Sequence, residues 1–130
     1  MIKFEGVILN SEIDSNGNII SKECLKSIAK QIKNIPIGFE FNPSIPPIYG
    51  FVKRGKFKNN QVLVEAEVEK PLHEVKMYIV PSFKVNKTHL ENGINVLDEV
   101  ELLEMSLTTQ PSDRHLDYIK WRGENDKTGN

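Results

Sequence analysis

Hydrophobic and polar residues alternate over several short stretches of the chain, a pattern typical of half-buried β-strands. We expect strands over residues 2–9, 37–41, 48–57, 61–69, 79–86 and 94–107. The alternation is clearest from Val62 to Val68, where small apolar residues alternate with Leu63 and glutamates, so one face should be buried. Asn59 and Asn60 should close one hairpin, and a turn at Asn92 and Gly93 should separate the last two strands.

One segment has helical spacing instead. Its apolar residues recur every three or four positions and leave lysines on the other side: Cys24, Leu25, Ile28, Ala29 and Ile32. Ser21 is a suitable N-cap, so we expect a helix over residues 22–33 that Pro36 prevents from continuing. Pro71 predicts a second, short helix over 71–78.

The order of these elements predicts a mainly β (α+β) fold. We expect a small antiparallel, partly closed β-barrel, with one helix after the first strand and a short helix in mid-chain. The length of 130 residues suits one domain, which we place at 1–112. Residues 113–130 form a polar tail, in which Leu116, Tyr118, Ile119 and Trp121 could dock as a short helix or bind a partner.

The charges along the chain indicate which classes of partner to expect. A formal net charge of −1 argues against a protein that coats nucleic acid. The local basic run Lys53, Arg54, Lys56 and Lys58 is either a phosphate-contacting patch or, the reading we favour, a solvated strand face beside a hairpin. No apolar run approaches the roughly 18 residues that a membrane helix needs, so no membrane partner is expected.

Standard catalytic and cofactor motifs are missing from the sequence. It has no Walker loop, no dinucleotide glycine pattern and no histidine pair at metal-binding spacing, so we expect neither a cofactor nor a metal. The lone cysteine, Cys24, lies on the apolar side of the predicted helix and suits the core better than a nucleophile's position. His73, His89 and His115 are scattered among charged residues.

Four segments in order resemble the tailed-phage prohead (procapsid maturation) proteases, which share their fold with the herpesvirus assemblins. The first is the N-terminal strand with the turn segment of residues 14–20 that leads into Ser21 and the helix. The others are the strand and Pro-Ile-x-Gly segment of 39–52, the Pro-Ser strand of 80–85, and the Glu-x-Ser-Leu strand of 103–112, closed by a proline. In that family a catalytic histidine ends the first strand of the second segment, before the Pro/Ile-Gly strand, and the third segment carries the nucleophilic serine.

The resemblance implies a degenerate catalytic triad of Ser82, Asn42 and Glu104. Asparagine stands where the family has its histidine, and an amide cannot take a proton from serine at neutral pH. Phe83 and Lys84 also replace the small residues that make room for an oxyanion. His73, nine residues before Ser82, is an alternative base.

The function that this resemblance implies is that of a phage or prophage head-morphogenesis protein. We expect it to be catalytically inactive and to bind coat or scaffold proteins, as an oligomer or a capsid-associated component. It would act in the host cytoplasm during head assembly, or in the virion. The alternatives are a prohead maturation serine endopeptidase, active or silenced by an engineered change at position 42, and an unrelated small β-barrel binding domain.

Overall fold

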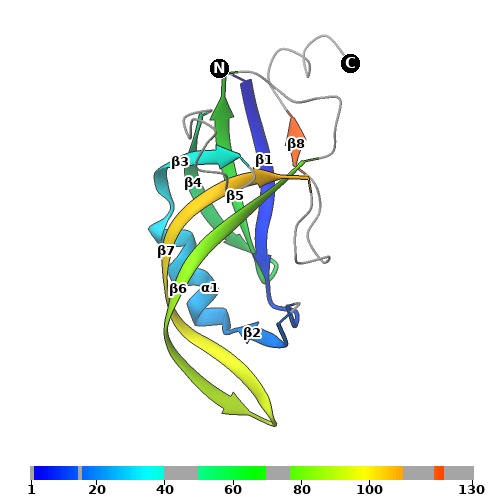
Figure 1. Cartoon of the computed structure of the whole chain (residues 1–130), viewed down its shortest axis with the longest axis vertical. Coiled ribbons are helices and arrows are strands. Elements are labelled where there is room, and N and C mark those ends of the chain that lie inside the picture. Colours follow the sequence, from blue (N-terminus) through cyan, green and yellow to red (C-terminus); the bar gives the residue numbers. More distant parts are fainter. Residues whose placement is uncertain (1, 15, 40–49, 70–76, 110–118, 122–130) are drawn as a thin grey trace.

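The computed structural model describes residues 2–14, 16–39, 50–69, 77–109 and 119–121, which form one sheet and one helix (Figure 1). In chain order the elements are β1 (Ile2–Asn10), β2 (Asn18–Ile20), α1 (Lys22–Gln31), β3 (Lys33–Phe39), β4 (Gly50–Lys58), β5 (Gln61–Val68), β6 (Tyr78–Glu91), β7 (Ile94–Thr108) and β8 (Lys120–Trp121). The predicted mainly β fold, with one helix after the first strand, is therefore confirmed.

The sheet is mixed, not antiparallel throughout as predicted. Its eight strands lie in the order β2-β7-β3-β4-β5-β1-β8, with β6 on β7 outside this path. Both β2 and β3 run parallel to β7, whereas the remaining pairs are antiparallel. Parallel partners need a long crossover and no turn marks them, so hydrophobic alternation within each strand could not reveal this pairing.

The strands do not close into the barrel that the sequence predicts. Among the described residues no strand ladder joins β6 to β8 or β1. The two sides do approach each other, because Ile119, just before β8, donates a backbone hydrogen bond to Met77 at 2.8 Å. Gly6 of β1 also lies against Ile79 of β6, so close that an added Cβ would come within 2.8 Å of that side chain. The sheet is thus strongly curved but open.

Two asparagine-containing turns set the registers of the antiparallel hairpins. Asn59 (φ 53°) and Asn60 (φ 59°) join β4 to β5, and Asn92 (φ 53°) and Gly93 (φ 79°) join β6 to β7. Positive φ at both central residues is the type I′ geometry, whose twist matches that of the flanking strands. Both turns were predicted. Because the second turn is so tight, β6 continues to Glu91 and is longer than the predicted 79–86.

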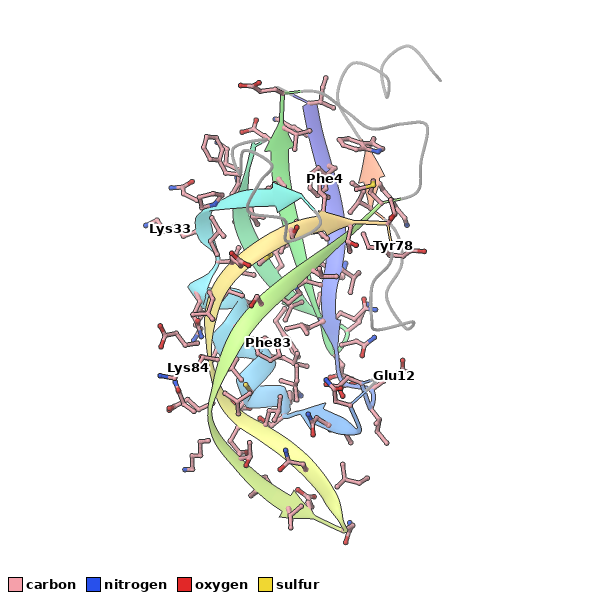
Figure 2. The ribbon with its side chains drawn as sticks, viewed as in Figure 1. Phe4, Glu12, Lys33, Tyr78, Phe83 and Lys84 are labelled. Atoms are coloured by element: carbon pink, nitrogen blue, oxygen red, sulfur yellow. The ribbon has the colours of Figure 1, made fainter. Side chains whose placement is uncertain are left out.

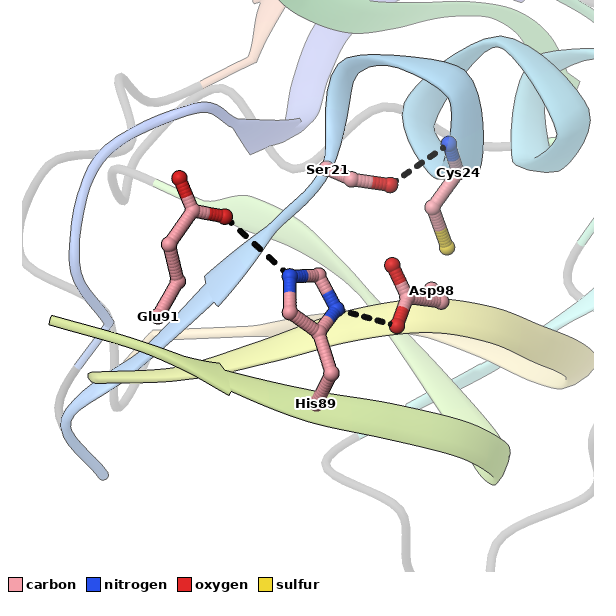
Figure 3. A network of polar contacts seen from close by, with 5 residues as sticks. All are labelled: Ser21, Cys24, His89, Glu91 and Asp98. Carbon is pink, nitrogen blue, oxygen red and sulfur yellow. Dashed lines mark hydrogen bonds and ion pairs between the residues drawn. The ribbon is translucent and has the colours of Figure 1, made fainter. Parts of the chain in front are cut away.

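Helix α1 begins as predicted, with the Ser21 hydroxyl accepting the Cys24 backbone N–H at 3.1 Å (Figure 3). It ends at Gln31 and not at residue 33, because Ile32 is already extended and β3 starts at Lys33, earlier than the predicted strand start at 37. The side-chain amide of Gln31 makes two hydrogen bonds to the β7 backbone. Its Nε2 donates to Val100 O, and its Oε1 accepts from Leu102 N. No helix in the described part of the chain is long and apolar enough to cross a membrane.

The core lies between α1 and the concave face of the sheet. The apolar residues that predicted the helix are all buried, and the alternating Val62, Val64, Ala66 and Val68 of β5 are at most 2% exposed. Phe4, Ile37 and Leu107 complete the centre of this cluster from β1, β3 and β7. The prediction that one face of β5 is buried is confirmed.

The described residues of the predicted mid-chain helix and of the predicted tail helix are not helical. Tyr78 opens β6 instead of ending a helix, and residues 71–76 lie outside the described residues. In the tail, Lys120 and Trp121 form a strand that pairs with Glu5 and Phe4 of β1. Leu116 and Tyr118 lie outside the described residues. The described part of the tail is therefore an edge of the sheet, not a helix.

Candidate functional site

Ser82 and Glu104 face each other across the β6–β7 ladder. They are direct partners in the antiparallel register, so their side chains lie on the same face. Ser82 is partly buried and Glu104 is exposed. Leu103, next to Glu104, has no partner in the register and forms a bulge there, more than half exposed at 56%. The structure thus brings together two of the three residues that the resemblance implies for a catalytic site.

The base of such a site is not found among the described residues. His89 is the sole described histidine, and it lies seven residues beyond Ser82 on the same strand, roughly 23 Å along β6. A general base must be within about 3 Å of the proton that it removes. Asn42 and His73, the two predicted candidates for this position, lie outside the described residues. Of the three implied triad positions, the described residues therefore supply the serine and the acid.

His89 belongs to a different polar cluster, near the tip of the hairpin (Figure 3). Its Nδ1 lies 2.6 Å from Oδ2 of Asp98, and its Nε2 lies 3.1 Å from Oε2 of Glu91. Asp98 is unpaired in the register and bulges toward His89. The hydrogen bond to Asp98, then that to Glu91, raises the pKa of His89 above its ordinary value.

With a carboxylate at each ring nitrogen, His89 is an ion-pair partner and not a poised base. When the imidazole is protonated, it donates to both acids and has no nitrogen left to accept a proton from a substrate. The sequence pattern did not indicate this cluster. The spacing of His89 and Glu91, two apart on a predicted strand, was visible, but the Asp98 bulge that completes it was not.

Glutamates of β5 form ion pairs with Lys53, Arg54 and Lys56 of the basic run on β4. Lys53 pairs with Glu67 at 3.1 Å, and Arg54 and Lys56 both pair with Glu65 at 3.0 Å. Lys53 is the extra residue of a bulge between Val52 and Arg54, which lets neighbouring cations reach the β5 acids. This arrangement matches the favoured solvated strand face, because a phosphate there would compete with two carboxylates.

Cys24 is a core residue, as the sequence predicts. It is 1% exposed, and burial raises the pKa of its thiol. A buried protonated thiol is neither an effective nucleophile nor a ready metal ligand. Within the described ranges, no group of three or more His, Cys, Asp or Glu side chains is arranged to hold a metal ion.

Comparison of the chain with protein-family models, curated proteins and solved structures finds no match. The functional argument therefore rests on the residues and their geometry.

Proposed function

We propose that this chain is a non-catalytic head-morphogenesis protein of a phage or prophage, with a prohead-protease-like fold. It binds coat or scaffold proteins during head assembly in the host cytoplasm and stays associated with the capsid. The observation that carries the proposal is the pairing of Ser82 with Glu104, without a histidine beside them in the described chain.

The Ser82–Glu104 pairing supports the resemblance to the protease family, and the asparagine at position 42 supports the lack of catalysis. Two residues 22 positions apart, each singled out by a different motif, are direct neighbours in the β6–β7 ladder. The third position is an asparagine in the sequence, which can hydrogen-bond but cannot act as the base. Loss of one member of such a unit lowers turnover by on the order of 10⁴–10⁶.

The second candidate is a prohead maturation serine endopeptidase. The observation that favours it is again the Ser82–Glu104 neighbourhood, which an active site would keep. It requires a base from outside the described residues, and His73 is the candidate. Under this alternative, coat and scaffold chains are substrates and not binding partners.

Labelling with a serine-directed phosphonate, followed by intact-mass measurement, separates the two candidates. We expect negligible labelling of the parent chain, faster labelling of Asn42→His, and none of Asn42→His with Ser82→Ala. The recovery should be partial because Phe83 and Lys84 flank the serine. Fast labelling of the parent that is lost in Ser82→Ala would favour the endopeptidase. Equal, negligible labelling of all three would remove the ground for a decayed catalytic site.

Binding is tested with coat and scaffold chains encoded beside this gene. We expect the parent and Ser82→Ala to bind one of them equally and to leave it uncut over hours. Cleavage by the parent alone would overturn the non-catalytic proposal. Neither binding nor cleavage, or the absence of portal and coat genes nearby, would favour an unrelated binding domain.

A further inference from the structure

The outer half of the β6–β7 hairpin extends away from the rest of the sheet (Figure 1). We call residues 84–100 the arm. Every residue of β6 from Lys84 to Glu91 is exposed. On the far side of β7 the arm is paired with β2, from Asn95 to Leu97. In the described part of the chain no strand pairs with the other edge, that of β6.

This open edge carries large apolar side chains in water. Val85 is 42% exposed and Leu90 is 74% exposed, the highest value among the described large hydrophobic residues. Lys84 and Lys87 lie beside them, and Figure 2 shows Lys84 on the outside of the arm. An unpaired edge is a template for another strand, and lysines and bulges normally restrict which strands can add.

A bulge decides which side chains share a face of this edge. Val85 pairs with Val100 and Lys87 pairs with Glu99, so Asn86 between them has no partner. Without the bulge, odd-numbered residues would share a face. With it, one face carries Lys84, Lys87, His89 and Glu91, and the other carries Val85, Thr88 and Leu90.

From this arrangement we infer that the arm binds a second copy of itself, edge to edge, in an antiparallel pair centred on Thr88. The ladder then places Lys84 opposite Glu91 of the second copy and Val85 opposite Leu90 of the second copy. Lys87 meets His89 of the second copy, which holds two carboxylates. Each pair occurs twice by symmetry, and Asn86 stays outside the ladder in both copies.

The complementarity of these pairs is what selects a second copy over another strand. The exposed Val85 and Leu90 meet on one face. On the other face, Lys84 meets the Glu91 carboxylate, and Lys87 meets the cluster that His89 forms with the carboxylates of Asp98 and Glu91. Because Asn86 is skipped, Val85 falls opposite Leu90 and Lys84 opposite Glu91, and the partners share a face at every position. Such a self-complementary patch gives a closed two-fold dimer. The inference does not rest on the proposed head-assembly function.

Disulfide trapping tests the register. In the pair, the two Thr88 Cα atoms lie about 4.5–5.5 Å apart, within reach of a disulfide. Thr88→Cys should therefore give a covalent dimer under mild oxidation. Lys84→Cys is the matched control, because its copies lie six ladder positions apart, roughly 20 Å. The parent chain, with buried Cys24, sets the background. Cross-linking of Thr88→Cys no faster than of Lys84→Cys would overturn the inference.

Mixing experiments test the predicted contacts directly. Val85→Cys mixed with Leu90→Cys should cross-link mainly as the mixed dimer, since these two positions face each other. In sedimentation equilibrium, Lys84→Glu should weaken the dimer roughly tenfold by placing two like-charged pairs across it, and adding Glu91→Lys should restore it. Leu90→Ser should leave a monomer with an unchanged circular dichroism spectrum. A parent chain that stays monomeric at millimolar concentration would refute the dimer outright.

Discussion

Trp121 packs edge-on against Phe4, with ring centroids 5.3 Å apart and ring planes at 65°. The contact joins the short strand β8 to β1, more than a hundred residues earlier in the chain. Phe4 is 1% exposed and belongs to the centre of the core, so Trp121 covers the core at this edge of the sheet. The predicted polar tail thus contributes to the domain that it was expected to follow.

Truncating this tryptophan should destabilise the whole domain. We expect Trp121→Ala to lower the free energy of unfolding by about 2 kcal/mol, because it removes an aromatic pair and uncovers Phe4. Trp121→Phe should lose less than half of that. Urea unfolding followed by circular dichroism measures both. An alanine variant as stable as the parent would mean that β8 adds nothing to the domain.

The helix offers a sharper test of the core. Leu25 of α1 is fully buried in the core. We expect Leu25→Ala to lower the free energy of unfolding by ~2–5 kcal/mol through lost burial and a residual cavity. Lys22→Ala, exposed on the same helix, should stay within about 0.5 kcal/mol of the parent. Equal midpoints for the two variants in thermal unfolding would show that the helix does not pack as described.

Gly55 should tolerate no side chain, because α1 lies directly on it. An added Cβ would come within 2.7 Å of Ile32 Cδ1 and 3.0 Å of Ala29 O, and backbone cannot easily give way. We expect Gly55→Ala to cost about 1–3 kcal/mol by overpacking. Gly38→Ala is the matched control, since its nearest neighbours would be 3.7 Å away. Denaturant midpoints that shift equally in both would argue against close helix–strand contact.

His89 should make the arm sensitive to pH. The hydrogen bond to Asp98 first, and that to Glu91 second, raises the pKa of His89 in the folded protein. The ion pairs therefore stabilise the folded state fully at pH values below the pKa of an unfolded histidine, about 6.5. That contribution is lost as the pH rises through the higher pKa of the folded protein. Asp98→Asn should move the His89 titration, followed by NMR of the ring protons, back toward 6.5. A titration that Asp98→Asn leaves in place would contradict the cluster.

The sequence was most informative where local chemistry decides the structure. Ser21 marked the start of α1, and the asparagine turns placed both hairpins, because caps and type I′ turns depend on a few neighbouring residues. Strand β2 was missed, since three residues are too few to show a period. The parallel partners of β7 were also missed, because nothing local encodes a contact between distant segments.

The candidate site divides in the same way. The motifs singled out Ser82 and Glu104 separately, and the structure makes them ladder partners. Nothing local indicated that Asp98 would bulge out of β7 toward His89, because a bulge depends on how both strands twist. For the same reason, the faces of the arm follow from the Asn86 bulge and not from alternation.

The Gln31 side chain, bonded to the backbone of β7 across sequence separations of 69 and 71 residues, has a consequence for synthesis on the ribosome. Helix α1 and strand β3 emerge long before β7 exists, and β7 is their partner on one side. Until β7 has been synthesised, the apolar face of β3 and the C-terminal end of α1 lack this partner. A fold so dependent on distant contacts forms slowly, and its nascent chain is a natural client for chaperones.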